Sequence, residues 1–178
     1  MVGEIVFPRL FFIYLHEQRL YEPHLCTADY SRMLSKMEKI WDPLRKKEVA
    51  LTPEERVRQW FIGILRDNMK VPEHMMMSEV GMKFGTGVGS ILTKSSRKEF
   101  RADILVYDRN LRPLMVVECK RPEVELTDAV VQQALTYNRV LDVRYITVTN
   151  GLKTIICRLQ GDTFVPLSKA PSYEEMIR

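Results

Sequence analysis

The chain has 178 residues, of which 46% are hydrophobic and 28% are charged. This length is enough for one domain with its own core, and the composition excludes an intrinsically disordered chain. Lysine and arginine exceed aspartate and glutamate by 27 to 23, so the net charge of +4 permits an anionic partner without requiring one. The three cysteines are isolated, which favours neither a disulfide framework nor a zinc site.

Residues 1–50 are expected to form an N-terminal extension that packs on the rest of the chain. Their longest apolar stretch, residues 5–15, is interrupted by Pro8 and is shorter than the ~18 residues that a membrane helix needs. Glu4 stands where a signal peptide would be basic, and no cleavage site follows. Helical spacing of apolar side chains predicts a helix over 28–41. We therefore expect a soluble, cytoplasmic protein with no membrane partner.

The second expected unit, residues 51–178, begins with a helix. Thr52 fits the N-cap, Pro53 fits the first helical position, and Glu55 completes a capping box. Apolar side chains then recur at helical spacing to about residue 69. Helical geometry directs Glu54 toward the apolar face and Glu55 away from it. This assigns Glu55 to the cap and favours Glu54 for a site, while two solvated acids remain an alternative.

Five β-type segments follow, with a helix between the third and the fourth. The segments are 77–84, 101–107, 113–119, 145–149 and 152–159, and the helix is 126–141. Turn-forming residues at 108–113 predict one hairpin. Asn150-Gly151 predicts another, because both residues accept positive φ. The order helix, three strands, helix, two strands is typical of an α/β fold around a mixed sheet.

Three charged side chains lie where folding alone would favour apolar ones. Asp103 interrupts an apolar strand, and Glu118 and Lys120 end the most apolar strand on one face. Charges beside a buried sheet are costly unless they pair or bind a metal, so we expect the three to converge. Two carboxylates suit Mg²⁺ or Mn²⁺, and a lysine can neutralise developing charge. A salt bridge of Lys120 with Glu118 or Asp103 explains the same residues equally well.

The helix predicted at 126–141 carries Gln133 and Tyr137 on the same stripe as Leu126 and Val130. A buried amide and a buried phenol both need hydrogen-bond partners. Either residue alone is common in a protein core. Both together, directly after the Glu-x-Lys strand, favour a functional site.

Four sets of residues, taken in chain order, resemble the N-terminal nuclease domain of type I restriction enzyme R subunits. The sets are Asp103, Glu118-Cys119-Lys120-Arg-Pro122, Gln133-x-x-x-Tyr137 and Thr149-Asn150-Gly151. The resemblance covers about residues 42–175 and departs from the pattern at Ala102, where the superfamily motif has proline. That domain belongs to the PD-(D/E)XK nuclease superfamily, so the resemblance implies a metal-dependent phosphodiesterase with an α-β-β-β-α-β core.

The resemblance also implies roles for individual residues. Asp103, Glu118 and the backbone carbonyl of Cys119 would bind Mg²⁺ or Mn²⁺, and Lys120 would be the catalytic lysine. Gln133 and Tyr137 would contact DNA. An acid from the first helix often joins such sites; we favour Glu54, and Glu55 and Glu79 remain open.

The resemblance further bears on partners. No helicase motor follows the domain in this chain, so we expect it to stand alone, with DNA as a partner and with other restriction-modification subunits or a helicase as further ones. A homo-oligomer is also open. A nuclease-fold module that binds nucleic acid or protein without catalysis is the main alternative.

The segment between the first two predicted strands is basic. Residues 85–90 are glycine-rich but lack the Gly-Lys-Ser/Thr ending of a phosphate-binding loop, so a hairpin loop is expected. Lys94, Arg97 and Lys98 follow and could contact DNA phosphates. A solvated loop explains these three residues equally well.

Overall fold

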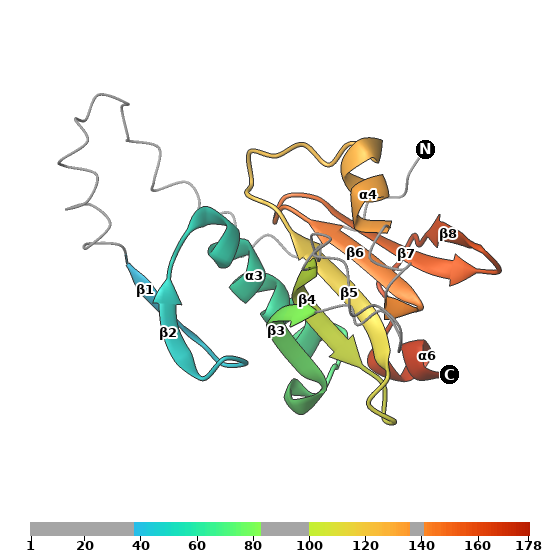
Figure 1. The fold of residues 1–178 in the computed structure, drawn as a ribbon, viewed down its shortest axis with the longest axis horizontal. Helices are drawn as coiled ribbons and strands as arrows, with labels where there is room; N and C mark the ends of the chain where they lie inside the picture. Colours follow the sequence, from blue (N-terminus) through green and yellow to red (C-terminus); the bar gives the residue numbers. More distant parts are fainter. Residues whose placement is uncertain (1–37, 83–99, 136–140) are drawn as a thin grey trace, which may run out of the picture.

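The computed structural model describes residues 38–82, 100–135 and 141–178, and its centre is a six-stranded mixed sheet (Figure 1). The sheet order is β3-β4-β5-β6-β7-β8; β5 and β6 are parallel, and the other neighbouring pairs are antiparallel. The strands are β3 (Met76–Met82), β4 (Phe100–Tyr107), β5 (Pro113–Cys119), β6 (Tyr145–Thr149), β7 (Thr154–Gln160) and β8 (Thr163–Pro166). The mixed sheet and the hairpin between β4 and β5 confirm the prediction.

The predicted first helix is confirmed as α3 (Pro53–Gly63), which continues as one π-helical turn over Ile64–Asn68. The Thr52 side chain accepts the backbone N–H of Glu55, as an N-cap does, and Pro53 occupies the first turn. A short 3₁₀ turn over Glu73–Met75 then leads into β3.

Helices cover both faces of the sheet. On one face, α3 and the C-terminal helix α6 (Tyr173–Ile177) share a core with Ile104 and Val117. On the other, α4 (Asp128–Leu135) packs over Leu105 and Val116. The result is an α/β layered architecture whose buried apolar contacts hold α3 against β4 and β5. No helix in the described parts of the chain is long and apolar enough to span a membrane.

The helix predicted over 28–41 is wrong at its C-terminal end, and residues 1–37 lie outside the described part of the chain. Strand β1 (Lys39–Asp42) pairs with β2 (Lys47–Ala50) as an antiparallel hairpin separate from the main sheet (Figure 1). The Asp42 carboxylate accepts the backbone N–H groups of residues 44 and 45, which closes the turn. This local hydrogen bonding competes with helix formation and outweighs the helical spacing of the apolar side chains.

The hairpin between β6 and β7 is confirmed, but its turn differs from the predicted one. Gly151 has a φ of 83°, whereas Asn150 is outside the left-handed region. Asn150 acts instead through its side chain, whose Oδ1 accepts the N–H groups of Leu152 and Lys153. Strand β8 and helix α6 were not predicted; α6 begins with a capping box formed by Ser172 and Glu175.

Candidate active site

Asp103 lies in a fork where β4 and β5 separate. The register of the two strands runs from Tyr107–Pro113 to Ile104–Val117 and ends there. The buried Asp103 carboxylate then accepts the backbone N–H of Cys119 through Oδ2, at 2.7 Å. A side-chain bond thus takes the place of the next ladder bond, and it brings Asp103 to the end of β5 as the sequence predicted.

Glu118 and Lys120 form an ion pair at the end of β5. Lys120 Nζ lies 2.7 Å from Glu118 Oε1, and both side chains are largely buried. Burial by itself lowers the pKa of Lys120, but the hydrogen bond and charge of Glu118 outweigh it, with further contributions from Asp103 and Glu54, so the pKa is raised. Lys120 is therefore protonated at neutral pH and can act as a cation, not as a base.

The backbone of Cys119 faces the fork. Lys120 donates its backbone N–H to the Thr149 carbonyl of β6 at 2.8 Å. Backbone groups alternate in direction along a strand, so the backbone N–H of the preceding residue, Cys119, points toward β4. Within a strand the C=O of a residue points to the same side as its N–H, so the Cys119 carbonyl is also directed to the β4 side of β5. Burial, together with the charge of Asp103, raises the pKa of the Cys119 thiol well above its usual range, so the thiol is no nucleophile.

One of the two acids of the first helical turn, Glu55, departs from its predicted position. Glu54 is 44% exposed, lies 3.6 Å from Arg58 Nη2 and contributes to the raised pKa of Lys120, so it lies on the site side as predicted. Glu55 was predicted to face away and to complete a capping box. Both predictions are wrong, because its side chain is only 7% exposed and the Thr52 N–H bonds to the Ala50 carbonyl instead of to Glu55. Arg45 and Arg58 both bind the Glu55 carboxylate and draw it into the interior.

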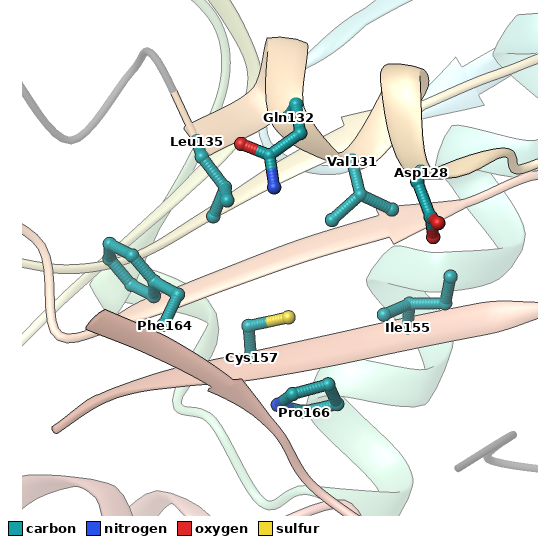
Figure 2. A pocket seen from close by; sticks show the side chains of 8 residues that line it. All are labelled: Asp128, Val131, Gln132, Leu135, Ile155, Cys157, Phe164 and Pro166. Atoms are coloured by element: carbon teal, nitrogen blue, oxygen red, sulfur yellow. The ribbon is translucent and has the colours of Figure 1, made fainter. Parts of the chain in front are cut away.

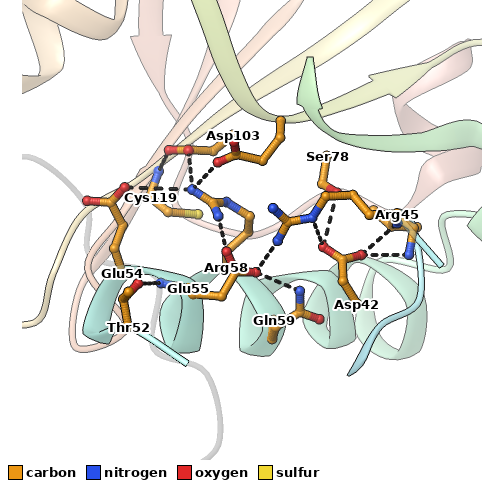
Figure 3. A network of polar contacts seen from close by, with 12 residues as sticks. Asp42, Arg45, Thr52, Glu54, Glu55, Arg58, Gln59, Ser78, Asp103 and Cys119 are labelled. Atoms are coloured by element: carbon orange, nitrogen blue, oxygen red, sulfur yellow. Dashed lines mark hydrogen bonds and ion pairs between the residues drawn. The ribbon is translucent and has the colours of Figure 1, made fainter. Parts of the chain in front are cut away.

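Arg58 is a site residue that the sequence reasoning missed. Its side chain is 5% exposed, and its Nη2 lies 2.6 Å from Asp103 Oδ1 and 2.8 Å from Glu79 Oε1. Its Nη1 binds Glu55 (Figure 3). One signal could have found it: Arg58 follows Glu54 by four positions, so the two share a helix face.

Glu79 also belongs to this cluster. The β3–β4 register pairs Ser78 with Ile104 and Val80 with Ala102, which places Glu79 opposite Asp103. Its φ of 57° is unusual for a residue with a side chain and costs roughly 1 kcal/mol or more. The carboxylate is 13% exposed and contacts Arg58 and Arg101, so Glu79 is not a solvated strand residue.

A chain of alternating charges connects this cluster with the β1–β2 hairpin (Figure 3). Asp42 is fully buried and accepts hydrogen bonds from Arg45 and from Ser78 Oγ, at 3.2 Å for Ser78. Arg45 Nη2 lies 2.5 Å from Glu55 Oε1, and Glu55 in turn binds Arg58. The hairpin is therefore bound to the helix that carries the site.

The structure does not describe the side chains of the remaining predicted site residues. Gln133 is in α4 but its side chain is not described, and Tyr137, Lys94, Arg97 and Lys98 fall in undescribed segments. Their DNA contacts stay predictions. Within the described ranges, no group of three or more His, Cys, Asp or Glu side chains is arranged to hold a metal ion.

A cavity of about 220 Å³ lies elsewhere, between α4 and the β7–β8 end of the sheet (Figure 2). Its lining is largely apolar and includes Val131, Leu135, Cys157 and Phe164. Burial raises the pKa of the Cys157 thiol. None of the predicted site residues lines this cavity, so the charged cluster and the cavity are separate features.

The charged cluster falls within a segment that matches a known family. Residues 53–171 match the family described as "Type I restriction enzyme R protein N terminus (HSDR_N)". No curated protein matches the chain. Among solved structures, a fragment assigned to an HsdR subunit of a type I restriction enzyme from Vibrio vulnificus YJ016 is similar, with a TM-score of 0.52 and 23% identity over 71% of this chain.

That likeness concerns the fold, and the matched region spans only 24% of the Vibrio fragment's length. The family match is broader, because it covers α3, all six strands of the main sheet and the charged cluster around Arg58, but not the β1–β2 hairpin. The chain therefore belongs to the type I restriction enzyme R protein N-terminal family.

Proposed function

We propose that this chain is a metal-dependent DNA nuclease with a PD-(D/E)XK site that hydrolyses phosphodiester bonds. The observation that carries the proposal is the position of Asp103 in the β4–β5 fork, bonded to Cys119 beside the Glu118–Lys120 pair. Family membership supports it. So does the element order α3-β3-β4-β5-α4-β6, which agrees with the α-β-β-β-α-β order of that superfamily.

The donor atoms of the site suit Mg²⁺ or Mn²⁺. The Asp103 and Glu118 carboxylates and the Cys119 carbonyl are hard oxygen donors, and magnesium sites in proteins commonly use one or two carboxylates and keep several waters. A divalent ion bound there would polarise a phosphate oxygen and lower the pKa of a water.

The proposed reaction also needs a cation beside the phosphate, a group that orients the water and contacts with DNA. Protonated Lys120, held by Glu118, can neutralise charge that develops on the phosphate oxygens. Glu54 is accessible at the start of α3 and can orient an attacking water. Gln133 and Tyr137 are proposed as DNA contacts on the strength of the resemblance alone, and Lys94, Arg97 and Lys98 on the strength of their positive charge.

Partners follow from the same proposal. DNA is the proposed substrate, and other restriction-modification subunits or a helicase are the proposed protein partners. The Vibrio fragment is assigned to a subunit of a type I restriction enzyme, which supports a multi-subunit setting.

A second function is a nuclease-fold module that binds DNA without cleaving it. Both proposed metal-binding acids already have a protein cation beside them, Arg58 at Asp103 and Lys120 at Glu118. Such pairing satisfies the carboxylates without a metal.

One experiment separates the two functions. Purified wild-type protein and Glu118→Ala are incubated with supercoiled plasmid in Mg²⁺, in Mn²⁺ and in EDTA, and binding to the same plasmid is measured by gel shift. A nuclease nicks the plasmid only with a divalent ion and loses nicking in Glu118→Ala. Binding without nicking in any condition supports the second function, and nicking that survives in Glu118→Ala contradicts the proposed site.

A further inference from the structure

Arg58 is a buried guanidinium in contact with carboxylates from three elements. Its Nη2 lies 2.6 Å from Asp103 on β4, 2.8 Å from Glu79 on β3 and 3.6 Å from Glu54 on α3. Its Nη1 binds Glu55. Figure 3 shows the Arg58 side chain directed from α3 toward Asp103, with Glu54 and Glu55 beside it. This is a central position in the acidic part of the site.

The carboxylates around Arg58 outnumber the other cations that contact them. Glu55 also binds Arg45, and Glu79 also binds Arg101, so each of these acids has a second cation. Among the described ion pairs, Asp103 is held by Arg58. A buried carboxylate that loses its cation is strongly unfavourable. Arg58 therefore supplies the cation that contacts Asp103 directly, whereas Lys120, which is also near Asp103, is bonded to Glu118.

Contacts with the surrounding carboxylates hold the Arg58 guanidinium in place. Glu79 holds its left-handed backbone conformation while its carboxylate contacts Nη2. Such backbone strain persists only where the surrounding contacts enforce it. The Nε of Arg58 is buried and has no hydrogen-bond partner within the described structure, so the carboxylates hold the guanidinium through its two terminal nitrogens.

We propose that Arg58 is the internal counter-ion of this site: it holds Asp103, Glu79 and Glu54 together without a divalent ion and competes with a divalent ion for Asp103. The inference rests on the proposed function, in which Asp103 binds the metal. Arg58 is then a positioning residue whose charge sets the affinity of the site for Mg²⁺ or Mn²⁺.

The direction of the effect follows from Coulomb's law. A guanidinium and a divalent ion that both approach Asp103 repel each other, and at roughly 5 Å this repulsion is worth about tenfold in affinity even at the dielectric constant of water. Removing the positive charge should therefore strengthen metal binding. Removing a residue that merely packs should not.

The test measures binding of Mn²⁺ alone, through the electron paramagnetic resonance signal of free Mn²⁺, in wild type, Arg58→Gln and Arg58→Lys. We expect Arg58→Gln to bind Mn²⁺ about tenfold more tightly than wild type, including the case in which wild-type binding is too weak to detect. Arg58→Lys is the matched control, because it keeps the charge but loses the planar fork, and it should stay close to wild type. Equal or weaker binding by Arg58→Gln, or no binding by any of the three, overturns the inference.

Thermal melting with and without Mn²⁺ gives a second readout, because the loss of a purely structural residue lowers the melting temperature but is not reversed by Mn²⁺. Without metal, Arg58→Gln should melt well below wild type, because its acids repel one another, and Mn²⁺ should restore most of the loss. A loss that Mn²⁺ does not restore overturns the inference. Plasmid nicking is scored separately: absent nicking with the expected binding pattern contradicts the nuclease proposal and leaves the role of Arg58 intact.

If Arg58→Gln does not fold, the inference is tested by NMR on the wild-type protein. The Nε–H of Arg58 is buried, so its ¹⁵N–¹H resonance reports on the guanidinium, and the resonance missing from Arg58→Lys assigns it. Adding Mg²⁺ should shift this resonance as the contact with Asp103 weakens. A resonance that stays unchanged up to the highest tolerated Mg²⁺ concentration overturns the inference.

Discussion

The Asp103 carboxylate accepts the backbone N–H of Cys119 at 2.7 Å, across 16 positions of sequence. This bond stands where β4 and β5 stop pairing, so the acid proposed to bind a metal also completes the sheet. Its other oxygen accepts from Arg58 at 2.6 Å. A substitution at Asp103 therefore changes the site and the sheet together.

The first prediction concerns Asp103→Asn. An amide has one oxygen for two donors, so its NH₂ must face either the Cys119 N–H or the guanidinium of Arg58. We expect the free energy of unfolding, measured by urea denaturation without divalent ions, to fall by about 1–3 kcal/mol. Nicking activity should also be lost.

The control is Asp162→Asn, at an exposed position between β7 and β8, which should stay within about 0.5 kcal/mol of wild type. If Asp103→Asn were more stable than wild type, repulsion between the carboxylates of Asp103 and Glu118 would outweigh the two lost acceptor contacts.

A second prediction concerns Lys120 and alkaline pH. The pKa of Lys120 is raised in the folded protein, because the bond to Glu118 outweighs the effect of burial. Its contribution to stability is thus fully present below the unfolded pKa of about 10.4 and is lost as pH rises through the folded value. Melting temperatures between pH 8 and 11.5 should fall less steeply in Lys120→Met than in wild type.

Exposed Lys169→Met serves as the control for that series and should reproduce the wild-type slope. Identical slopes for wild type and Lys120→Met would show that the Glu118–Lys120 pair makes no net contribution. Lys120→Met should also lose nicking while keeping the fold, because the proposed role of Lys120 is to compensate charge on the phosphate.

A third prediction concerns Asp42 and acid pH. Burial by itself raises the pKa of Asp42, but hydrogen bonds from the Arg45 backbone and side chain and from Leu44 outweigh it, so the pKa is lowered. The stabilising contribution of the ionised carboxylate is present above the unfolded pKa of about 3.9 and is lost as pH falls through the lower folded value.

Asp42→Asn should therefore flatten the acid side of the stability profile, measured as melting temperature between pH 2.5 and 6. The variant should also be less stable than wild type at pH 6, because Arg45 loses a carboxylate partner. An acid profile that matches wild type would mean that Asp42 is not linked to folding.

The strands of the site could be predicted because each is encoded locally. Segment 113–119 is a nearly continuous apolar run, segment 101–107 is apolar from Ile104 onward, and turn residues lie between them; the structure places β4 and β5 there. The Glu118–Lys120 contact also follows from local spacing, since residues two apart in a strand share a face.

The acidic cluster around Arg58 could not be predicted in this way. Arg58 and Asp103 are 45 positions apart, and Arg45 and Glu55 meet only because the β1–β2 hairpin folds back on α3. Helical geometry alone directs Glu55 outward, but two arginines at different sequence distances draw it inward. Pairings of this kind depend on tertiary structure, which one sequence does not display.

The last prediction concerns Asn150, which ties the β6–β7 turn to the segment that follows Lys120. Its Oδ1 accepts the N–H groups of Leu152 and Lys153, and its Nδ2 donates to the Val124 carbonyl at 2.9 Å. Asn150→Ala removes all three bonds from a buried position and should cost about 2–3 kcal/mol in the free energy of unfolding.

Asn150→Asp separates the two functions of this side chain. A carboxylate still accepts the two turn N–H groups, but it cannot donate to the Val124 carbonyl. Hydrogen exchange should therefore accelerate in residues 121–127 for both variants, and in residues 150–153 for Asn150→Ala alone. If exchange in 121–127 is unchanged in Asn150→Asp, the bond to Val124 does not hold that segment in place, and the position of Lys120 must depend on β5 and Glu118 instead.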